Sequence, residues 1–234
     1  MRKRAARRRA RVTVRELIDA ADPAFRPAHA LLRSSFHRGE MLPVADWRNA
    51  MRERRENLWT DLNWHLLVAE RNGKVLAAAS GSYQGNLNIG LVGYIAVAPA
   101  ARAMGLGPRM RRALVRRFEA DAWRLHGAPL RAIVGEVRPD NPWLGTLVRQ
   151  GAIALDFPYY QPSLGKKKEP VPLVLYYQPM DRPRRSLPVA EVRRMLFSIW
   201  RRSYRVPRPL QHPEFRAMLR TLRGKRVGSR PDLR

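Results

Sequence analysis

Apolar positions recur along the chain with two distinct periods, which separate strands from helices. Alternation and short apolar runs predict seven strands, over residues 12–16, 64–70, 74–83, 87–97, 130–138, 153–160 and 171–178. Apolar residues spaced three and four apart predict amphipathic helices over residues 25–36, 45–58, 108–125 and 141–150. In chain order these elements run β-α-α-β-β-β-α-β-α-β-β. We therefore predict a fold of the α/β (α+β) class.

A glycine-containing turn joins the strand over 87–97 to the helix that follows it. Its sequence is Val97-Ala98-Pro99-Ala100-Ala101-Arg102-Ala103-Met104-Gly105-Leu106-Gly107. The first N–H groups of a helix have no partner inside it, and they lie at the positive end of the helix dipole. Gly105 and Gly107 lack a Cβ, so a ligand can approach the backbone closely. The turn is therefore predicted to bind a phosphate or pyrophosphate group. Its spacing matches neither the dinucleotide fingerprint nor the Walker loop.

Residues 181–234 extend the chain beyond the last predicted strand. A linker rich in Pro and Arg is followed by a predicted helix over 189–204, and a shorter helix is predicted over 213–222. One apolar stripe runs along the first of these helices, through Val192, Met195, Leu196, Ile199 and Trp200. Such a stripe must be covered, so we expect the extension to dock on the preceding domain or on a second copy in a homodimer, with its arginines facing outward.

The positive charge of the chain is concentrated at its two ends. The formal net charge is +27, with 46 Lys and Arg against 19 Asp and Glu. Residues 1–12 carry seven basic residues and no acidic one, and residues 181–234 carry sixteen basic against four acidic. Residues 1–11 show no periodicity and are expected to form a disordered basic arm. Either the ends contact a polyanion such as RNA, DNA or anionic lipid, or they are simply solvated charge.

Composition excludes several classes of chemistry. The chain has no cysteine, which rules out disulfides, thiolate metal sites and a cysteine nucleophile. There is no apolar run of 18 residues and no apolar segment after the basic N-terminus, so neither a membrane span nor a secretory signal is expected. We expect a cytoplasmic protein without a metal cofactor.

The glycine turn resembles that of the GNAT superfamily of acetyl-CoA-dependent N-acyltransferases. The family pattern is Arg/Gln-x-x-Gly-x-Gly/Ala, usually with Val-x-Pro three residues before the Arg, and here Val97, Pro99, Arg102, Gly105 and Gly107 fill every fixed position. The order of predicted elements agrees with the family as well. The resemblance implies a GNAT domain over 12–180 with a mixed central sheet of about seven strands flanked by helices. It also implies acetyl-CoA, or another acyl-CoA, as co-substrate and an amine of unknown identity as acceptor.

The resemblance also implies where the co-substrate binds. In the family, the strand before the glycine turn parts from the next strand, and its free backbone groups hold the pantetheine arm and the thioester. The N–H groups of the turn hold the pyrophosphate, and a residue at the start of the helix after the fifth strand often contacts the pantetheine. In this chain the corresponding residues are Tyr94, Ile95, Ala96, Val97, Arg102, Ala103, Met104, Gly105, Leu106, Gly107 and Asn141.

Two carboxylates are candidates for the base that takes a proton from the amine. Glu136 lies on the fifth predicted strand, where apolar neighbours on both faces are expected to desolvate its carboxylate and raise its pKa. In the family this strand borders the acceptor site. The alternative for Glu136 is a structural ion pair with Arg131 or Arg138. Glu40 is the second candidate, because the loop between the first two helices lines the acceptor side in relatives.

One family residue is missing. Many GNAT members carry a Tyr that protonates the leaving thiolate, four residues before the Gly that ends the fourth helix, and this chain has Leu147 there. Tyr160, or its neighbour Tyr159, is a candidate to replace it, and solvent is the other proton source. The missing Tyr leaves a second function open: a catalytically weak acyl-CoA-binding protein that associates with nucleic acid or the ribosome through its basic ends.

Overall fold

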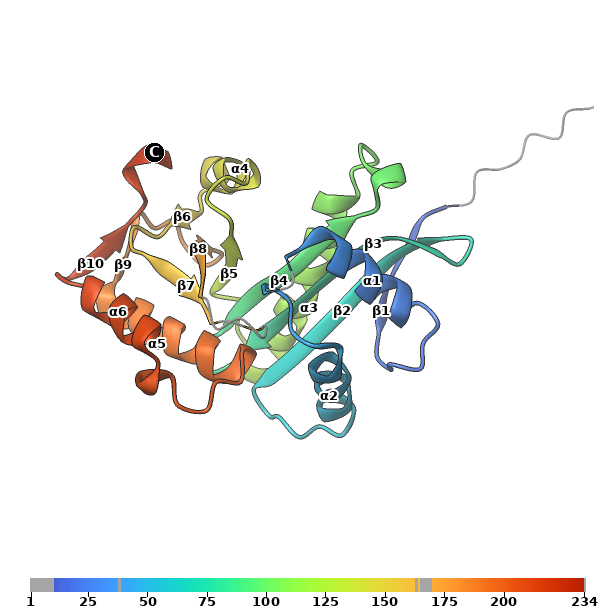
Figure 1. The fold of residues 1–234 in the computed structure, drawn as a ribbon, viewed down its shortest axis with the longest axis horizontal. Coiled ribbons are helices and arrows are strands. Elements are labelled where there is room, and N and C mark those ends of the chain that lie inside the picture. Colours follow the sequence, from blue (N-terminus) through green and yellow to red (C-terminus); the bar gives the residue numbers. More distant parts are fainter. Residues whose placement is uncertain (1–10, 38, 163, 165–169, 234) are drawn as a thin grey trace, which may run out of the picture.

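The computed structural model describes residues 11–37, 39–162, 164 and 170–233, so the arm predicted over 1–11 lies outside the described residues except for Arg11. Eight strands form one sheet in the order β1-β2-β3-β4-β5-β8-β6, with β7 paired to β8 (Figure 1). Their bounds are β1 (Thr13–Leu17), β2 (Leu62–Arg71), β3 (Lys74–Gln84), β4 (Ile89–Val97), β5 (Ala132–Val137), β6 (Ile153–Ala154), β7 (Tyr159–Gln161) and β8 (Val171–Pro179). Only the β4–β5 pair is parallel among these described strands. This mixed sheet confirms the predicted fold class.

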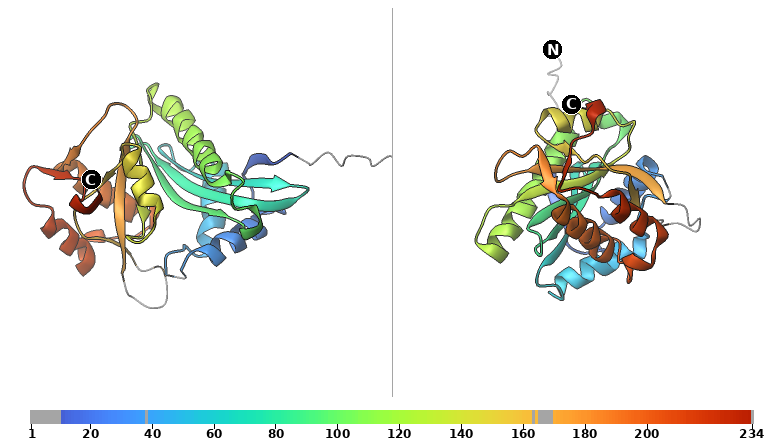
Figure 2. Two further views of the ribbon diagram at one scale, coloured as in Figure 1. Left: turned by 90° about the horizontal axis from the view of Figure 1, so that it is seen from above. Right: turned by 90° about the vertical axis from the view of Figure 1, so that its left-hand side faces the viewer.

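Helices cover both faces of the sheet. In Figure 2, α1 (Phe25–Ser35) and α2 (Val44–Arg55) lie on one face of strands β2 to β4, and α3 (Leu106–His126) lies on the other. Phe118 anchors α3 in the core and is fully buried. A Cβ on Gly90 would lie 2.1 Å from the Phe118 ring, so this close approach requires a glycine in β4. The shorter α4 (Trp143–Arg149) follows β5.

The strand predicted over 153–160 is divided in the structure. It forms β6 and β7, and residues between them also bond to the end of the chain, although the N–H of Leu155 still donates to the carbonyl of Leu175 in β8 at 3.0 Å. Leu155 forms a bridge with Ser229, and the N–H of Asp156 donates to the carbonyl of Gly228 at 3.0 Å. Pro158 has no N–H with which to continue a ladder. The prediction of one strand was therefore wrong because Pro158 and a distant segment interrupt it.

The C-terminal extension packs on the sheet of the same chain. It contains β9 (Ser186–Pro188), α5 (Val189–Ser198), a π-helical turn (Ile199–Ser203), α6 (Pro213–Thr221) and β10 (Arg226–Gly228), which pairs with β9. The predicted apolar stripe is buried along its whole length. It shares one hydrophobic cluster with residues of the sheet, among them Ile89, Leu91, Val134, Leu173 and Leu175. The helix predicted over 189–204 thus docks on the preceding part of its own chain. This was one of two predicted alternatives, the other being a second copy of the chain.

Some arginines of the extension do not face outward, contrary to the prediction. Arg202 forms a two-pronged ion pair with Asp61 at 2.5 and 3.1 Å, and its side chain is only 18% exposed. Arg184 lies within reach of Asp181 and Glu191. These guanidinium groups lie inward because carboxylates of the folded chain pair with them. Part of the positive charge of this segment is therefore used to fix it in place.

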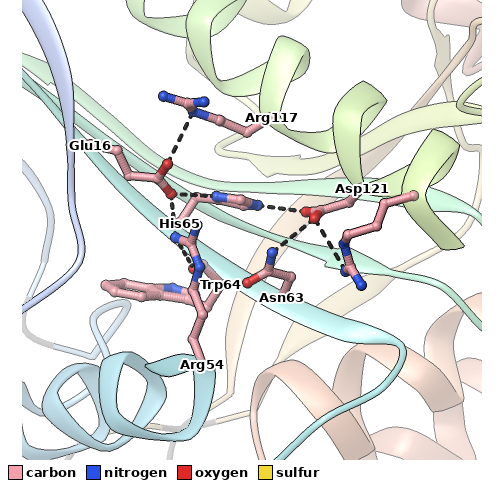
Figure 3. A network of polar contacts seen from close by, with 8 residues as sticks. Glu16, Arg54, Asn63, Trp64, His65, Arg117 and Asp121 are labelled. Atoms are coloured by element: carbon pink, nitrogen blue, oxygen red, sulfur yellow. Dashed lines mark hydrogen bonds and ion pairs between the residues drawn. The ribbon is translucent and has the colours of Figure 1, made fainter. Parts of the chain in front are cut away.

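A buried polar network links four elements on the α3 side of the sheet (Figure 3). His65 of β2 lies between two carboxylates, with Nδ1 2.6 Å from Glu16 and Nε2 2.7 Å from Asp121. Arg54 of α2 also donates to Glu16, and Asn63 donates to Asp121 at 2.8 Å. Hydrogen bonds to a charged partner are among the stronger ones in proteins. The network therefore ties β1, β2, α2 and α3 together.

Candidate active site

Strands β4 and β5 part at one end and leave an opening in the sheet. Their parallel pairing runs from Ile89 opposite Ala132 to Val92 opposite Gly135, and no described pairing continues it. From Tyr94 to Val97, β4 stays paired with β3 alone. A register shift beside Ser80 marks the place where β4 begins to turn away. Backbone groups of β4 that point away from β3 are thus free of a described strand partner and available to an extended ligand.

The turn after β4 has the backbone conformation expected of a phosphate site. A 3₁₀ turn at Pro99–Ala101 leads to Ala103 and Gly105, which both have positive φ, of 65° and 66°. Helix α3 begins directly afterwards. No hydrogen bond is found, among the described residues, for the N–H groups of Gly105, Leu106 and Gly107. These donors and the positive end of a 21-residue helix can together hold an anion.

A cavity of about 320 Å³ opens at the point where β4 and β5 part. Five parts of the chain line it: the segment from α1 to β2, the strands β3 and β4, the end of β5 with the region after it, the strands β7 and β8, and the C-terminal extension. Among the residues in its wall are Phe36, Glu40, Trp47, Trp64, Ser82, Val92, Tyr94, Glu136, Arg138, Asn141, Arg202, Ser203 and Tyr204. Trp47 and Tyr94 stack with ring centroids 5.8 Å apart and give the cavity an apolar side.

Glu136 is held in this cavity by two tyrosine hydroxyls. Tyr159 of β7 donates to Oε1 of the carboxylate, and Tyr204 of the extension donates to Oε2. Burial raises the pKa of Glu136 to about 6, although the two hydrogen bonds act in the opposite direction because they favour the charged form. A carboxylate with such a pKa is mostly ionised at neutral pH and can still accept a proton. No ion pair of Glu136 with Arg131 or Arg138 is found among the described residues; those arginines pair with Glu191 and with Glu40.

Glu40 also lies in the wall of the cavity, but its carboxylate is engaged in an ion pair. Arg138 donates to Oε1 of Glu40 at 2.8 Å. The backbone carbonyl of Glu40 accepts hydrogen bonds from Tyr94 at 2.7 Å and from Gln161 at 3.0 Å. Glu40 is 6% exposed. These contacts fix the loop between α1 and α2 against β4 and β7.

The comparisons with known proteins agree with this geometry. The model of the acetyltransferase (GNAT) family matches residues 28–142, which include the parted strands, the glycine turn and Glu136. The chain belongs to the GNAT family. No curated protein matches it.

Solved structures share the GNAT fold. A GNAT-family protein of Bacteroides thetaiotaomicron is 17% identical with a TM-score of 0.60, over 83% of this chain and 99% of that one. The ribosomal-protein-alanine N-acetyltransferase of Brucella melitensis is 19% identical with a TM-score of 0.50, over 72% of this chain and 99% of that one. At these identities the similarity shows the fold alone.

The structure places three of the eleven residues predicted to bind the co-substrate in the wall of the cavity. Tyr94, Ile95 and Asn141 line the cavity, and Asn141 accepts a hydrogen bond from the N–H of Trp143 at the start of α4, at 3.0 Å. The remaining residues of the predicted cofactor set form the end of β4 and the glycine turn that follows it: Ala96, Val97, Arg102, Ala103, Met104, Gly105, Leu106 and Gly107. Leu147 is fully buried in the core.

Tyr160 is not among the residues that line the cavity. Alternation along β7 turns it away from Glu136, and its N–H approaches the sulfur of Met218 in α6. Its neighbour Tyr159 contacts Glu136 instead. Neighbouring residues of a strand point to opposite faces of the sheet, so only one of these two tyrosines can contact Glu136.

Sequence reasoning missed Tyr204 altogether. The only signal was its position four residues after Trp200, at the end of the apolar stripe of the extension. That spacing predicts that Tyr204 faces the docked surface, but not that Glu136 lies there. Ser203 and Arg202, which also line the cavity, were missed for the same reason.

Two further findings concern the described residues only. None of their helices is long and apolar enough to cross a membrane. No group of three or more His, Cys, Asp or Glu is found that could hold a metal ion.

Proposed function

We propose that this GNAT protein is an N-acetyltransferase that passes the acetyl group of acetyl-CoA, or the acyl group of a related thioester, directly to an amine. The observation that carries the proposal is that the parted strands and the carboxylate of Glu136 meet at one cavity, and that β4 runs from this cavity directly into the glycine turn. Each of the three supplies one requirement of the reaction: a place for the pantetheine arm, a site for the pyrophosphate, and a base.

Binding of the co-substrate is assigned to backbone groups. The unpaired N–H groups of Gly105, Leu106 and Gly107 are suited to the pyrophosphate, because they lie at the positive end of α3. The free edge of β4 from Tyr94 to Val97 is suited to the pantetheine amides and the thioester oxygen. A donor aimed at that oxygen stabilises the negative charge that develops on it during attack.

The chemical step uses Glu136 as base. Glu136 takes a proton from the ammonium of the acceptor, and the resulting amine attacks the thioester carbonyl carbon. A C–N bond forms, the nitrogen of the tetrahedral intermediate releases its second proton to solvent, and the C–S bond breaks, so that CoA leaves as its thiolate. With Leu147 at the usual Tyr position, we assign the proton for the thiolate to solvent. Glu136 then returns its own proton to solvent.

Calorimetric titration with acetyl-CoA, CoA and a longer acyl-CoA tests the co-substrate, at two salt concentrations because a cationic protein binds polyphosphates nonspecifically. Micromolar binding at one site that persists at the higher salt is expected. Gly105→Val should abolish it, since a β-branched residue is strained at φ 66°. Gly127→Val is the matched control: φ is 59° there, at the opposite end of α3. Loss of binding in both variants, or in neither, would contradict the assignment.

The acceptor is to be found by screening, with release of CoA thiol as the readout. A panel of small primary amines, amino acids, and peptides with free N-termini or lysines separates the main acceptor classes. None of the comparisons supports the alternative of a catalytically weak protein attached to nucleic acid or the ribosome. Contact of the basic ends with a polyanion, cytoplasmic location and homodimer formation all stay predictions.

A further inference from the structure

The C-terminal extension supplies part of the wall of the cavity. Arg202, Ser203, Tyr204 and Arg205 line it together with Glu136. Tyr204 donates its hydroxyl to one carboxylate oxygen of Glu136, while Tyr159 donates to the other. A residue that lies outside the segment matched by the GNAT family model therefore contacts the proposed base directly.

The backbone around Tyr204 has an uncommon conformation. The residues before it, Ile199–Ser203, form a π-helical turn in place of a continued α-helix. The residue after it, Arg205, has a positive φ of 56°, which is rare for a residue other than glycine. Such conformations persist only where surrounding contacts hold them, and they are frequent at functional sites.

Contacts with the strand-and-helix part of the chain hold this segment on both sides of Tyr204. Before it, Arg202 pairs with Asp61, and the hydroxyl of Ser203 accepts from Gln84 at 2.7 Å. After it, Arg205 forms a two-pronged ion pair with Glu53 at 2.6 and 2.8 Å. The hydroxyl of Tyr204 is thus aimed at Glu136 by anchors on α2, on β3 and on the loop between α2 and β2.

We propose that Tyr204 is a positioning residue for Glu136, so that the C-terminal extension is part of the acetyl-transfer machinery. Its hydroxyl fixes the orientation of the carboxylate and favours the ionised form, because a donor can bond to a charged oxygen more strongly than to a neutral one. Each carboxylate oxygen keeps a further lone pair, which can receive the proton of the acceptor. The inference rests on the proposed role of Glu136 as base.

The direct test is the titration of the Glu136 carboxyl group, followed by ¹³C NMR in the full chain labelled at the glutamate side-chain carboxyl. Glu136→Gln identifies the resonance by its absence, and we expect a midpoint of about pH 6 in the unaltered protein. Tyr204→Phe removes one donor and should raise the midpoint by about one pH unit. Tyr177→Phe is the control, because Tyr177 is buried and its hydroxyl has no partner among the described residues. An unchanged midpoint in folded Tyr204→Phe would overturn the inference.

A second variant covers the case in which Tyr204→Phe does not fold. Glu53→Gln weakens the anchor of Arg205 and leaves both Tyr204 and Glu136 in place. We expect its midpoint to rise in the same direction but by less than in Tyr204→Phe. A midpoint equal to that of the unaltered protein would show that the anchored segment does not act on Glu136.

The dependence of kcat/KM on pH separates this inference from the proposed function. With an acceptor from the screen, the rate should rise with pH through the midpoint of Glu136, and Tyr204→Phe should shift that rise upward by the amount seen in the titration. If kcat/KM of Glu136→Gln still rises with pH, Glu136 is not the base, and that part of the proposed function is wrong. If the rise of kcat/KM with pH is absent in Glu136→Gln but unshifted in Tyr204→Phe, Glu136 is the base and the proposed role of Tyr204 is refuted.

Discussion

A carboxylate oxygen of Glu16 lies 2.6 Å from Nδ1 of His65, and the imidazole ring of His65 is almost fully buried. Burial alone would raise the pKa of Glu16, but hydrogen bonds from His65 and Arg54 outweigh it and lower the pKa to about 2. The pKa of Asp121, on the other side of the ring, is also lowered, by its hydrogen bonds with His65 and Asn63 against the effect of burial. Each of the two carboxylates lies against one ring nitrogen of His65. His65 thus separates two buried negative charges.

Replacing His65 by Ala should destabilise the protein strongly. Removal of the ring takes one partner from each of two buried carboxylates, which keep Arg54 and Asn63, and such a loss costs about 1–3 kcal/mol for each buried group. Urea titration at pH 7 measures the change in the free energy of unfolding between the unaltered protein and His65→Ala. The matched control is His126→Ala, which removes a more exposed ring bonded only to the carbonyl of Gly85 at 2.9 Å. A similar loss of unfolding free energy in both variants would show that the buried network stabilises the protein no more than an exposed histidine does.

The same network predicts sensitivity to acid. Because the folded pKa of Glu16 is below its unfolded value of 4.5, its contribution is present above pH 4.5 and is lost as the pH falls toward 2. The contribution is about 3 kcal/mol, from the size of the pKa change. The difference in free energy of unfolding between the unaltered protein and Glu16→Gln should shrink by this amount between pH 5 and pH 2. A difference independent of pH would contradict the lowered pKa.

Glu136→Gln should reduce kcat by about 10²- to 10⁴-fold, the usual range for loss of a general base. In the unaltered protein the rate should rise through about pH 6, since Glu136 accepts a proton only when ionised. Acetyl-CoA affinity, measured by calorimetry, should hardly change. A variant that keeps both its rate and its pH profile would transfer the role to Glu40, and Glu40→Gln is then the next variant to measure.

The raised pKa of Glu136 has the opposite effect on stability. The folded pKa of about 6 lies above the ordinary value of 4.5 in the unfolded chain, so stability is highest below pH 4.5 and falls as the pH rises through 6. Relative to Glu136→Gln, the unaltered protein should lose about 2 kcal/mol of its free energy of unfolding between pH 4 and pH 7.5. Asp140→Asn serves as the control, because that side chain is 80% exposed. An equal trend in the control would assign the loss to general charge effects.

Trp200→Ala tests whether the extension is part of the folded unit. Trp200 is 1% exposed and packs in the cluster shared with the sheet, so its truncation should cost about 3–5 kcal/mol. Phe197, one turn earlier on the same helix, is 44% exposed, and Phe197→Ala should cost far less. Urea unfolding should show a single transition in all three proteins. A separate transition that Trp200→Ala alone shifts would mean that the extension folds independently.

Local patterns were sufficient to predict the parts of the site that lie close together in the chain. The motif from Val97 to Gly107 predicted the phosphate turn, and apolar neighbours on both sides of Glu136 predicted a raised pKa. The stripe from Val192 to Trp200 predicted a buried helix face. In each case the information lies within one strand, one turn or one helix.

The remainder of the site depends on pairings between distant residues. Tyr204 contacts Glu136 across 68 positions of sequence, and nothing in either segment specifies the other. The break after Ala154 depends on the bridge from Leu155 to Ser229, which no local period encodes. The choice between Tyr159 and Tyr160 likewise depends on the pairing of β7 with β8, because neighbouring residues of a strand point to opposite faces.

The late position of Tyr204 also governs when the site exists during synthesis of the chain. A ribosome makes Glu136 and the glycine turn well before Tyr204, and the strand that pairs with β9 follows only at Arg226–Gly228. Until those residues have left the exit tunnel, the sheet lacks the cover of α5 and α6 and the carboxylate lacks one of its donors. A nascent chain thus carries the complete GNAT motif with an unfinished cavity, and the cavity is completed only after Tyr204 and the strand at Arg226–Gly228 have been translated.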